Sequence, residues 1–182
     1  MGERADARRV RLERASRRRQ REFLAAVRRS RRLHARWVAP PASAPAYRTY
    51  LARLRRPTHL GYFVIRRDTG ALAGVINVSE IVRGNFQSAY LGYYAFTPHA
   101  GQGLMREGLA SVIDDAFTRL KLHRLEANIQ PANQASIRLV RTLGFHREGF
   151  SRRYLQIVAR WRDHERWALL AEDWQKTHRQ KS

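Results

Sequence analysis

The sequence contains no cysteine. Disulfide bonds, a thiolate nucleophile and a metal site with cysteine ligands are therefore excluded. The chain has no run of 18 apolar residues, so we expect no membrane-spanning helix. Its polar start lacks the apolar segment of a secretory signal, which favours a cytoplasmic protein without membrane contact.

Acidic residues and lysines are scarce. Asp and Glu number 15 against 36 Lys and Arg, the net charge is +21, and lysine occurs only at positions 121, 176 and 181. A strong positive field favours acidic partners such as RNA, phosphorylated cofactors or acidic proteins. The alternative is that the arginines only solvate helix faces. No aromatic residue interrupts the arginine run before Phe23, so a platform for stacking bases is not indicated.

The length of 182 residues and the apolar fraction of 43% predict a single domain over residues 1–182. We expect its core over about residues 10–174, with flexible ends. The first third predicts an edge strand around Val10 and Leu12, a helix capped by Ser16, a proline-rich break over residues 37–45 and a helix over residues 45–56.

The rest of the chain alternates strands and helices. A hairpin is predicted over residues 61–82 around the turn Asp68-Thr69-Gly70, followed by a strand over residues 88–96. Next come a helix over residues 103–120, a strand over 124–130, a helix over 135–143 ending at Gly144, and strands at 154–159 and 166–172 separated by residues 160–165. This order predicts a mixed α/β or α+β domain with a mostly antiparallel central sheet and flanking helices.

A glycine-bearing loop, TPHAGQGLMREGL over residues 97–109, connects a predicted strand to a predicted helix. It is not a P-loop, because no Gly-Lys-Ser/Thr follows, and it is not the dinucleotide fingerprint, because Arg106 stands at the third glycine position. Gly101 and Gly103 let several backbone N–H groups point inward at the positive end of a helix dipole, which favours a pyrophosphate. The alternative is a tight strand-to-helix turn.

A second motif makes the pattern more specific. Asn133 is followed by Ser136 three residues later and then by Leu143-Gly144-Phe145. Together with Gly-Gln-Gly-Leu-Met, this arrangement resembles the GNAT superfamily of acetyl-coenzyme A-dependent N-acyltransferases. The superfamily loop pattern is Arg/Gln-x-x-Gly-x-Gly/Ala; Gly103 matches its central glycine, whereas Ala100 and Met105 depart from it.

Longer segments are similar to the ribosomal-protein alanine N-acetyltransferases within that superfamily. The similar segments are residues 30–41, 77–94, 130–145 and 154–170, and the resemblance covers about residues 10–174. It implies a GNAT fold and transfer of an acetyl group from acetyl-CoA to an amine by direct attack, with no metal. The missing cysteine agrees with a reaction that forms no acyl-enzyme.

The resemblance also implies where acetyl-CoA would bind. Backbone N–H groups of the loop would hold the pyrophosphate: Gly101, Gln102, Gly103, Leu104 and Met105. Arg106 either contacts the 3′-phosphate or is solvated. The pantetheine arm would pair with the main chain of Ala95, Phe96 and Thr97 like an added strand, and the N–H of Phe96 would bind the oxyanion. Asn133 would contact the coenzyme or is simply a turn residue.

Three residues are candidates for proton transfer and water positioning. Many superfamily members use a tyrosine to protonate the departing sulfur, but Val140 occupies that position, so the resemblance implies Ser136 instead. Ser136 could equally cap its own helix. Glu80 is the candidate base, with a pKa raised by burial, unless it pairs with an arginine. Asn128 would position water, and Glu126 is expected to face the other side of that strand in a structural role.

The acceptor is the least determined part of the prediction. His34, Trp37, Tyr90 and Tyr93 would line its channel, or they belong to the core. We expect acetylation of a protein N-terminal α-amine, such as that of a ribosomal protein, by a monomer or homodimer whose arginines contact rRNA or the ribosome. The alternatives are acetylation of a small-molecule amine and an inactive GNAT-fold module that binds RNA.

Overall fold

The computed structural model describes residues 8–179. Its strands are β1 (Val10–Arg14), β2 (Leu60–Arg66), β3 (Leu72–Val82), β4 (Ser88–Ala95), β5 (Arg124–Ile129), β6 (His146–Ile157) and β7 (Arg160–Leu170). Its helices are η1 (Arg17–Arg19), α1 (Gln20–Arg29), α2 (Arg31–His34), α3 (Ala44–Arg53), α4 (Leu104–Thr118), α5 (Gln134–Thr142) and α6 (Ala171–Arg179). No helix in this range is long and apolar enough to cross a membrane.

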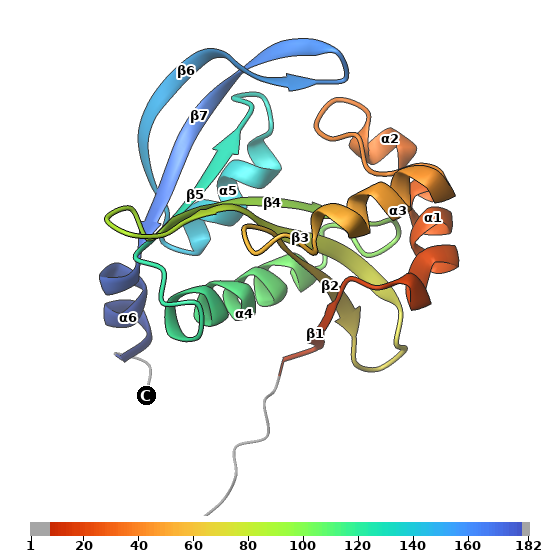
Figure 1. Ribbon diagram of the computed structural model, residues 1–182, viewed down its shortest axis with the longest axis horizontal. Helices are drawn as coiled ribbons and strands as arrows, with labels where there is room; N and C mark the ends of the chain where they lie inside the picture. The colour runs from red at the N-terminus through yellow and green to blue at the C-terminus, as the bar shows by residue number, and fades with distance from the viewer. Residues whose placement is uncertain (1–7, 180–182) are drawn as a thin grey trace, which may run out of the picture.

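The strands form one sheet in the order β1-β2-β3-β4-β5-β7-β6 (Figure 1). Neighbouring strands pair antiparallel except β4 and β5, which are parallel. The prediction of a mixed α/β fold with a mostly antiparallel sheet is confirmed.

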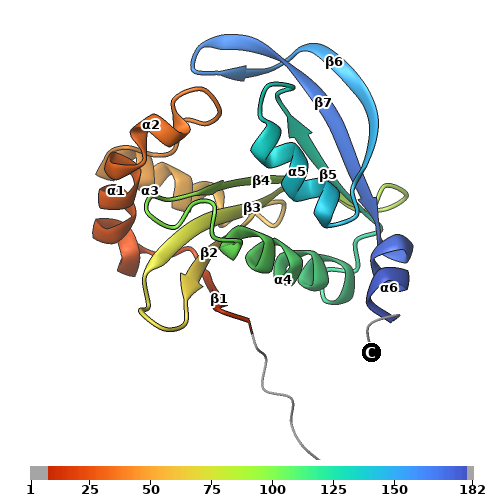
Figure 2. The same ribbon diagram turned by 180° about the vertical axis from the view of Figure 1, so that it is seen from behind.

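Two apolar clusters cover opposite faces of the sheet. Along β2, Val64 belongs to one cluster, while Phe63 and Ile65 belong to the other, as the alternation of a strand requires. The first cluster contains side chains of α4 and α5, and the second contains those of α1 and α3. Helices α4 and α5 therefore lie on one face and α1–α3 on the other (Figures 1 and 2).

Two predictions about the elements need correction. Ser16 precedes the short 3₁₀ turn η1 and its side chain makes no capping hydrogen bond, so α1 begins later, at Gln20. The polar stretch 160–165 lies inside β7, and β6 and β7 form one long hairpin with its turn at Val158 and Ala159. The hairpin's outer part projects from the sheet (Figure 1). Much of it is exposed, so it lacks the alternation of a half-buried strand.

Candidate active site

A cleft opens where β4 and β5 part. The two strands pair only between Ser88–Tyr90 and Arg124–Glu126. The cavity beyond has a volume of about 510 Å³ and is walled by β4, β5, the β4–α4 loop, the start of α5, the region around α2 and the β6–β7 hairpin. Twelve of the predicted site residues line it: His34, Trp37, Tyr93, Ala95, Gly101, Gly103, Leu104, Met105, Arg106, Asn128, Asn133 and Ser136.

The main chain of β4 offers hydrogen-bonding groups to this cleft. The N–H of Phe96 donates to the carbonyl of Ala73 in β3 at 2.8 Å. Because hydrogen-bonded pairs alternate along an antiparallel ladder, the N–H groups of Tyr93 and Ala95 point away from β3 and, beyond the last pairing with β5, toward the cleft. These two groups can bind an oxyanion or an extended amide chain. The prediction for Phe96 is wrong, because its N–H already has a partner in the sheet.

Residues after Phe96 hold the main chain in place. The N–H of Thr97 donates to the hydroxyl of Ser30 at 2.9 Å, so its predicted pairing with a ligand does not fit. The carbonyl of Ala95 accepts a hydrogen bond from Nε2 of His34 at 2.8 Å. Of the predicted pantetheine contacts, only Ala95 lines the cleft, with its N–H free of β3.

The glycine loop is built as an anion site. Gly101 and Gly103 have φ values of +79° and +78°, in the left-handed region that favours glycine. Gly103 is the N-cap of α4, so the first N–H groups of the helix point out of its end. Among residues 8–179, no hydrogen bond takes the N–H groups of Gly101, Gly103, Leu104 or Met105. Unpaired donors at the positive end of a helix fit a pyrophosphate.

Arg9 holds this loop in place through hydrogen bonds. Its guanidinium donates to Oε1 of Glu107 at 2.7 Å and to the carbonyl of Gln102 at 2.9 Å. Its backbone N–H donates to Oε2 of Glu107 at 2.8 Å. The contact neutralises the carboxylate in the first turn of α4. Gln102 itself lies outside the cleft, and its side chain donates to the carbonyl of Pro98, so it supports the loop and does not contact the cavity.

Three polar side chains meet at the start of α5. Asn133 is the N-cap, and its Oδ1 accepts the N–H of Ser136 at 3.2 Å. Ser136 is therefore not the cap, and its hydroxyl lies 2.6 Å from that of Tyr93. Burial raises the pKa of Tyr93 to about 12. A phenol and a serine hydroxyl thus form one hydrogen-bonded pair at the cleft wall, beside a helix N-terminus.

Alternation along β4 separates its tyrosines. Tyr93 faces α5, whereas Tyr94 faces the opposite side, where its ring centroid lies 5.3 Å from that of His34. Burial raises the pKa of Tyr94 well above its usual value. Tyr90 pairs with Tyr154, which raises the pKa of Tyr90 to about 12, and it does not line the cleft. Tyr94 therefore lines the cleft on the face opposite Tyr93, and the sequence analysis missed it although strict alternation could have found it.

His34 and Trp37, predicted for the acceptor channel, line the cleft on the same face as Tyr94. Because Nε2 of His34 donates to Ala95, its Nδ1 is the unprotonated nitrogen in the neutral ring, and burial lowers the pKa of His34. Nδ1 is buried and has no partner in the described chain. The guanidinium of Arg36 lies 5.4 Å from the ring centroid of Trp37. This wall is aromatic and positively charged.

Glu80 is not placed to act as a base. Its side chain is 66% exposed, lies 3.4 Å from Nε2 of His59 and does not line the cleft. Asn128 does line it, with a buried Oδ1 that lacks a partner among the described residues. Glu126 lies on the same face as Asn128, because the two are two residues apart, and its Oε1 is 2.8 Å from Arg124. The expectation that Glu126 faces the other way is wrong.

Replacing Glu80 with glutamine should leave activity within about twofold of the wild type, since surface ion pairs contribute little. The check is the kcat/KM for acceptor at pH 7.5, with thermal melting as a control for folding. A hundredfold loss of kcat/KM at unchanged stability would show that Glu80 takes part in catalysis.

No aspartate or glutamate is among the residues that line the cleft. The groups that could accept a proton near neutral pH are three imidazoles, those of His34, His99 and His164. His164 lies on the same face of the sheet as Asn128, because it is two residues from Arg166, which pairs with Asn128 across β5 and β7. The sequence analysis did not select it.

The imidazole of His164 is held in one tautomer. Its Nδ1 lies 2.9 Å from the carbonyl of Arg162, which can only accept a hydrogen bond, so Nδ1 carries the proton and Nε2 keeps its lone pair. The residue is 3% exposed, and burial lowers the pKa of His164. At neutral pH it is therefore an uncharged base. Its position between Asp163 and Glu165 in a polar segment gave no signal that it would line the cleft.

Comparisons with known proteins agree with this geometry. A family model described as an acetyltransferase (GNAT) domain matches residues 9–146. The probable N-acetyltransferase YjcK of Bacillus subtilis is 36% identical over 124 residues, which are 68% of each chain. The [ribosomal protein uS5]-alanine N-acetyltransferase of Escherichia coli is 41% identical over 107 residues, covering 59% of this chain and 55% of that enzyme. The match thus spans just over half the length of that relative.

Solved structures show the same fold. Mycobacterium smegmatis RimJ in complex with CoA-disulfide superposes with a TM-score of 0.82 at 25% identity, covering 90% of this chain and 82% of that one. The spermidine N-acetyltransferase of Vibrio cholerae in complex with CoA and spermine superposes with a TM-score of 0.78 at 20% identity, covering 92% and 98%. The second likeness concerns the fold alone.

Proposed function

Because the chain belongs to the GNAT acetyltransferase family and is an acetyl-CoA-dependent N-acetyltransferase, we propose that its acceptor is the α-amine of a protein N-terminus. The similarity to an alanine N-acetyltransferase that acts on ribosomal protein uS5 supports a ribosomal protein as the substrate. The observation that carries the proposal is the chemistry of the cleft.

The cleft has no carboxylate to attract or deprotonate a strongly basic amine. A lysine ε-amine has a pKa of about 10.4, whereas an α-amine has a pKa of about 7.7–8.0. An α-amine is substantially neutral near pH 7.5, and a neutral imidazole is a sufficient base for it. A polyamine would meet three histidines and Arg106 where it needs carboxylates, so this site disfavours the polyamine alternative.

The residues of the cleft divide between the two substrates. The loop donors from Gly101 to Met105, with the exposed Arg106, would hold the phosphates, and the free edge of β4 would bind the pantetheine amides. When bound, acetyl-CoA supplies an activated acetyl thioester. The N–H groups of Tyr93 and Ala95 point into the cleft and would stabilise the negative charge that develops on its carbonyl.

Proton transfer would use groups on opposite faces of the sheet. Tyr93 and Ser136 lie on the α5 side and would donate a proton to the departing sulfur. On the acceptor side, Nε2 of His164 would accept the proton of the attacking amine. Asn128 lies on that side too, and its unpartnered Oδ1 would hold a water molecule or the amine itself.

An acceptor panel tests the proposal. We expect acetylation of a peptide beginning with alanine, and at least tenfold lower kcat/KM for spermidine and for a peptide whose only amine is a lysine ε-amine. Mass spectrometry locates the acetyl group, and a peptide with a blocked N-terminus serves as the control. Preference for spermidine or the ε-amine would refute the proposal, whereas tight acetyl-CoA binding without any turnover would favour an inactive module.

A further inference from the structure

The helical layer on the acceptor side carries nearly all its charge in one sign. Thirteen arginines and a single carboxylate, that of Glu22, lie between residues 15 and 58. Both oxygens of Glu22 are occupied: Oε2 accepts from Arg19 at 2.6 Å and Oε1 accepts the N–H of Leu72 at 2.7 Å. No acidic group remains in this layer to balance the other arginines.

The other twelve arginines are exposed and form what we call the arginine face. None of them has a carboxylate within ion-pair distance in the part of the chain that the structure describes. They are Arg17, Arg18, Arg21, Arg28, Arg29, Arg31, Arg32, Arg36, Arg48, Arg53, Arg55 and Arg56. Such a density of unpaired guanidinium groups attracts a polyanion.

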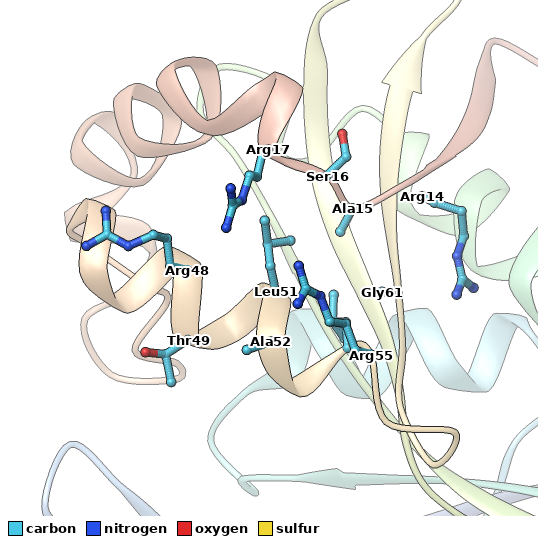
Figure 3. Close-up of a pocket in the computed structure, with 11 residues that line it drawn as sticks. Arg14, Ala15, Ser16, Arg17, Arg48, Thr49, Leu51, Ala52, Arg55 and Gly61 are labelled. Carbon is cyan, nitrogen blue, oxygen red and sulfur yellow. The ribbon is translucent and has the colours of Figure 1, made fainter.

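A groove lies within this face, between η1 and α3 (Figure 3). It has a volume of about 520 Å³, is lined by Arg17, Arg48 and Arg55, and has no carboxylate in its lining. Figure 3 shows the guanidinium groups of Arg17 and Arg55 on either side of Leu51. Arg14 also borders the groove but points away from it, over the ring of Tyr62. Guanidinium groups from two elements can thus contact the same phosphate backbone.

The face continues to the mouth of the cleft. In α2, Leu33 and His34 line the cleft, while Arg31 and Arg32 beside them are exposed. An acceptor whose N-terminus enters the cleft from this side would therefore contact the arginine face.

The surface chemistry favours nucleic acid over an acidic protein. Protein interfaces usually carry large apolar anchors, and among residues 15–58 the only exposed large hydrophobic side chain is Leu33, which belongs to the cleft. Residues 15–58 also present no exposed aromatic side chain for stacking single-stranded bases. The arginine face is therefore suited to contact a phosphate backbone. A structured duplex presents its phosphates on the outside, so a protein can bind it without reading the bases.

We propose that the arginine face binds structured RNA that carries the acceptor protein, so that the RNA delivers the N-terminus to the cleft. The choice of RNA rests on the proposed function, because a ribosomal protein is presented on RNA. Binding should be independent of sequence and strongly salt-dependent. Six phosphate contacts would reduce affinity by about a thousandfold between 50 and 200 mM salt.

The test compares two matched double variants. Arg48→Glu with Arg55→Glu reverses charge in the groove, and Arg138→Glu with Arg141→Glu reverses two exposed arginines of α5, on the opposite face of the sheet. Binding of an RNA hairpin with a 20-base-pair stem is measured at several salt concentrations. We expect at least a tenfold loss for the groove variant and less than a threefold loss for the α5 variant.

A second readout links binding to catalysis. An alanine peptide tethered to the RNA hairpin should be acetylated at least tenfold more efficiently than the free peptide at 50 mM salt. The groove variant should lose that gain and still acetylate the free peptide at the wild-type rate. Failure to acetylate any peptide would refute the proposed acceptor, whereas the binding comparison would still test the arginine face.

Four results would overturn the proposal. They are no RNA binding at 100 mM salt, equal losses in both double variants, equal affinity for a DNA duplex of the same length, and equal affinity for an acidic polypeptide. Thermal melting of both variants excludes a folding defect as the cause of a loss.

Discussion

Replacing Tyr93 with phenylalanine and Ser136 with alanine together should lower kcat by about 10²–10³-fold, the usual contribution of a general acid. The two hydroxyls lie 2.6 Å apart at the cleft wall, and either can donate to the other. Each single variant should lose much less, because the remaining hydroxyl can still protonate the departing sulfur. The residues are thus expected to couple in a double-mutant cycle.

The measurement is a steady-state assay of thiol release, with acetyl-CoA binding determined separately by calorimetry. Binding should change little, since the phosphate donors are elsewhere in the loop. Tyr90→Phe is the matched control, because it removes a phenol from the same strand outside the cleft. Full activity in the double variant would show that solvent protonates the sulfur and that the pair only packs.

Replacing His164 with alanine should reduce kcat/KM for a peptide acceptor by about 10²-fold at pH 7.5. The lost group is the neutral imidazole whose Nδ1 is bonded to Arg162 and whose Nε2 is free to accept a proton. Burial lowers the pKa of His164, so the wild type keeps its base at and somewhat below the ordinary histidine pKa of about 6.5. Activity through this group falls only when the pH drops through the lowered value.

The pH profile separates catalysis from packing. In the wild type, kcat/KM should fall at low pH with two ionisations, those of the acceptor amine and of His164. The variant should show only the amine ionisation, and added imidazole should restore part of its activity. A parallel profile without rescue would indicate that His164 has a structural role.

Much of the fold could be predicted because burial leaves a pattern in the chain. The hairpin around Asp68-Thr69-Gly70 and the helix after Gly103 have apolar residues at the expected periods, and both were confirmed. The β6–β7 hairpin was only partly predicted. Its outer part leaves the sheet and is exposed on both sides, so charged residues occupy strand positions there and no period appears.

The sequence predicted the parts of the cleft that depend on backbone conformation. It predicted less well the parts that depend on where side chains and N–H groups point. Gly101 and Gly103 are recognisable because glycine readily adopts the positive φ values found there. The motif at Asn133 and Ser136 indicated two residues that line the cleft. Phe96 and Glu80 failed because sheet pairing and exposure depend on neighbouring strands. Val140 stands where relatives carry a tyrosine, and the contact between the hydroxyls of Tyr93 and Ser136, from two different elements, could only be found in three dimensions.

The contact between Arg9 and the glycine loop connects the start of β1 to the proposed phosphate site. Arg9 lies 93 residues before Gln102 in the chain, yet it holds the carbonyl of Gln102 and the carboxylate of Glu107. Proteolytic cleavage or an affinity tag that displaces this strand would loosen the loop without touching a residue of the cleft. Recombinant versions are therefore better extended at the C-terminal end, and we expect a modification near residue 9 to change coenzyme affinity.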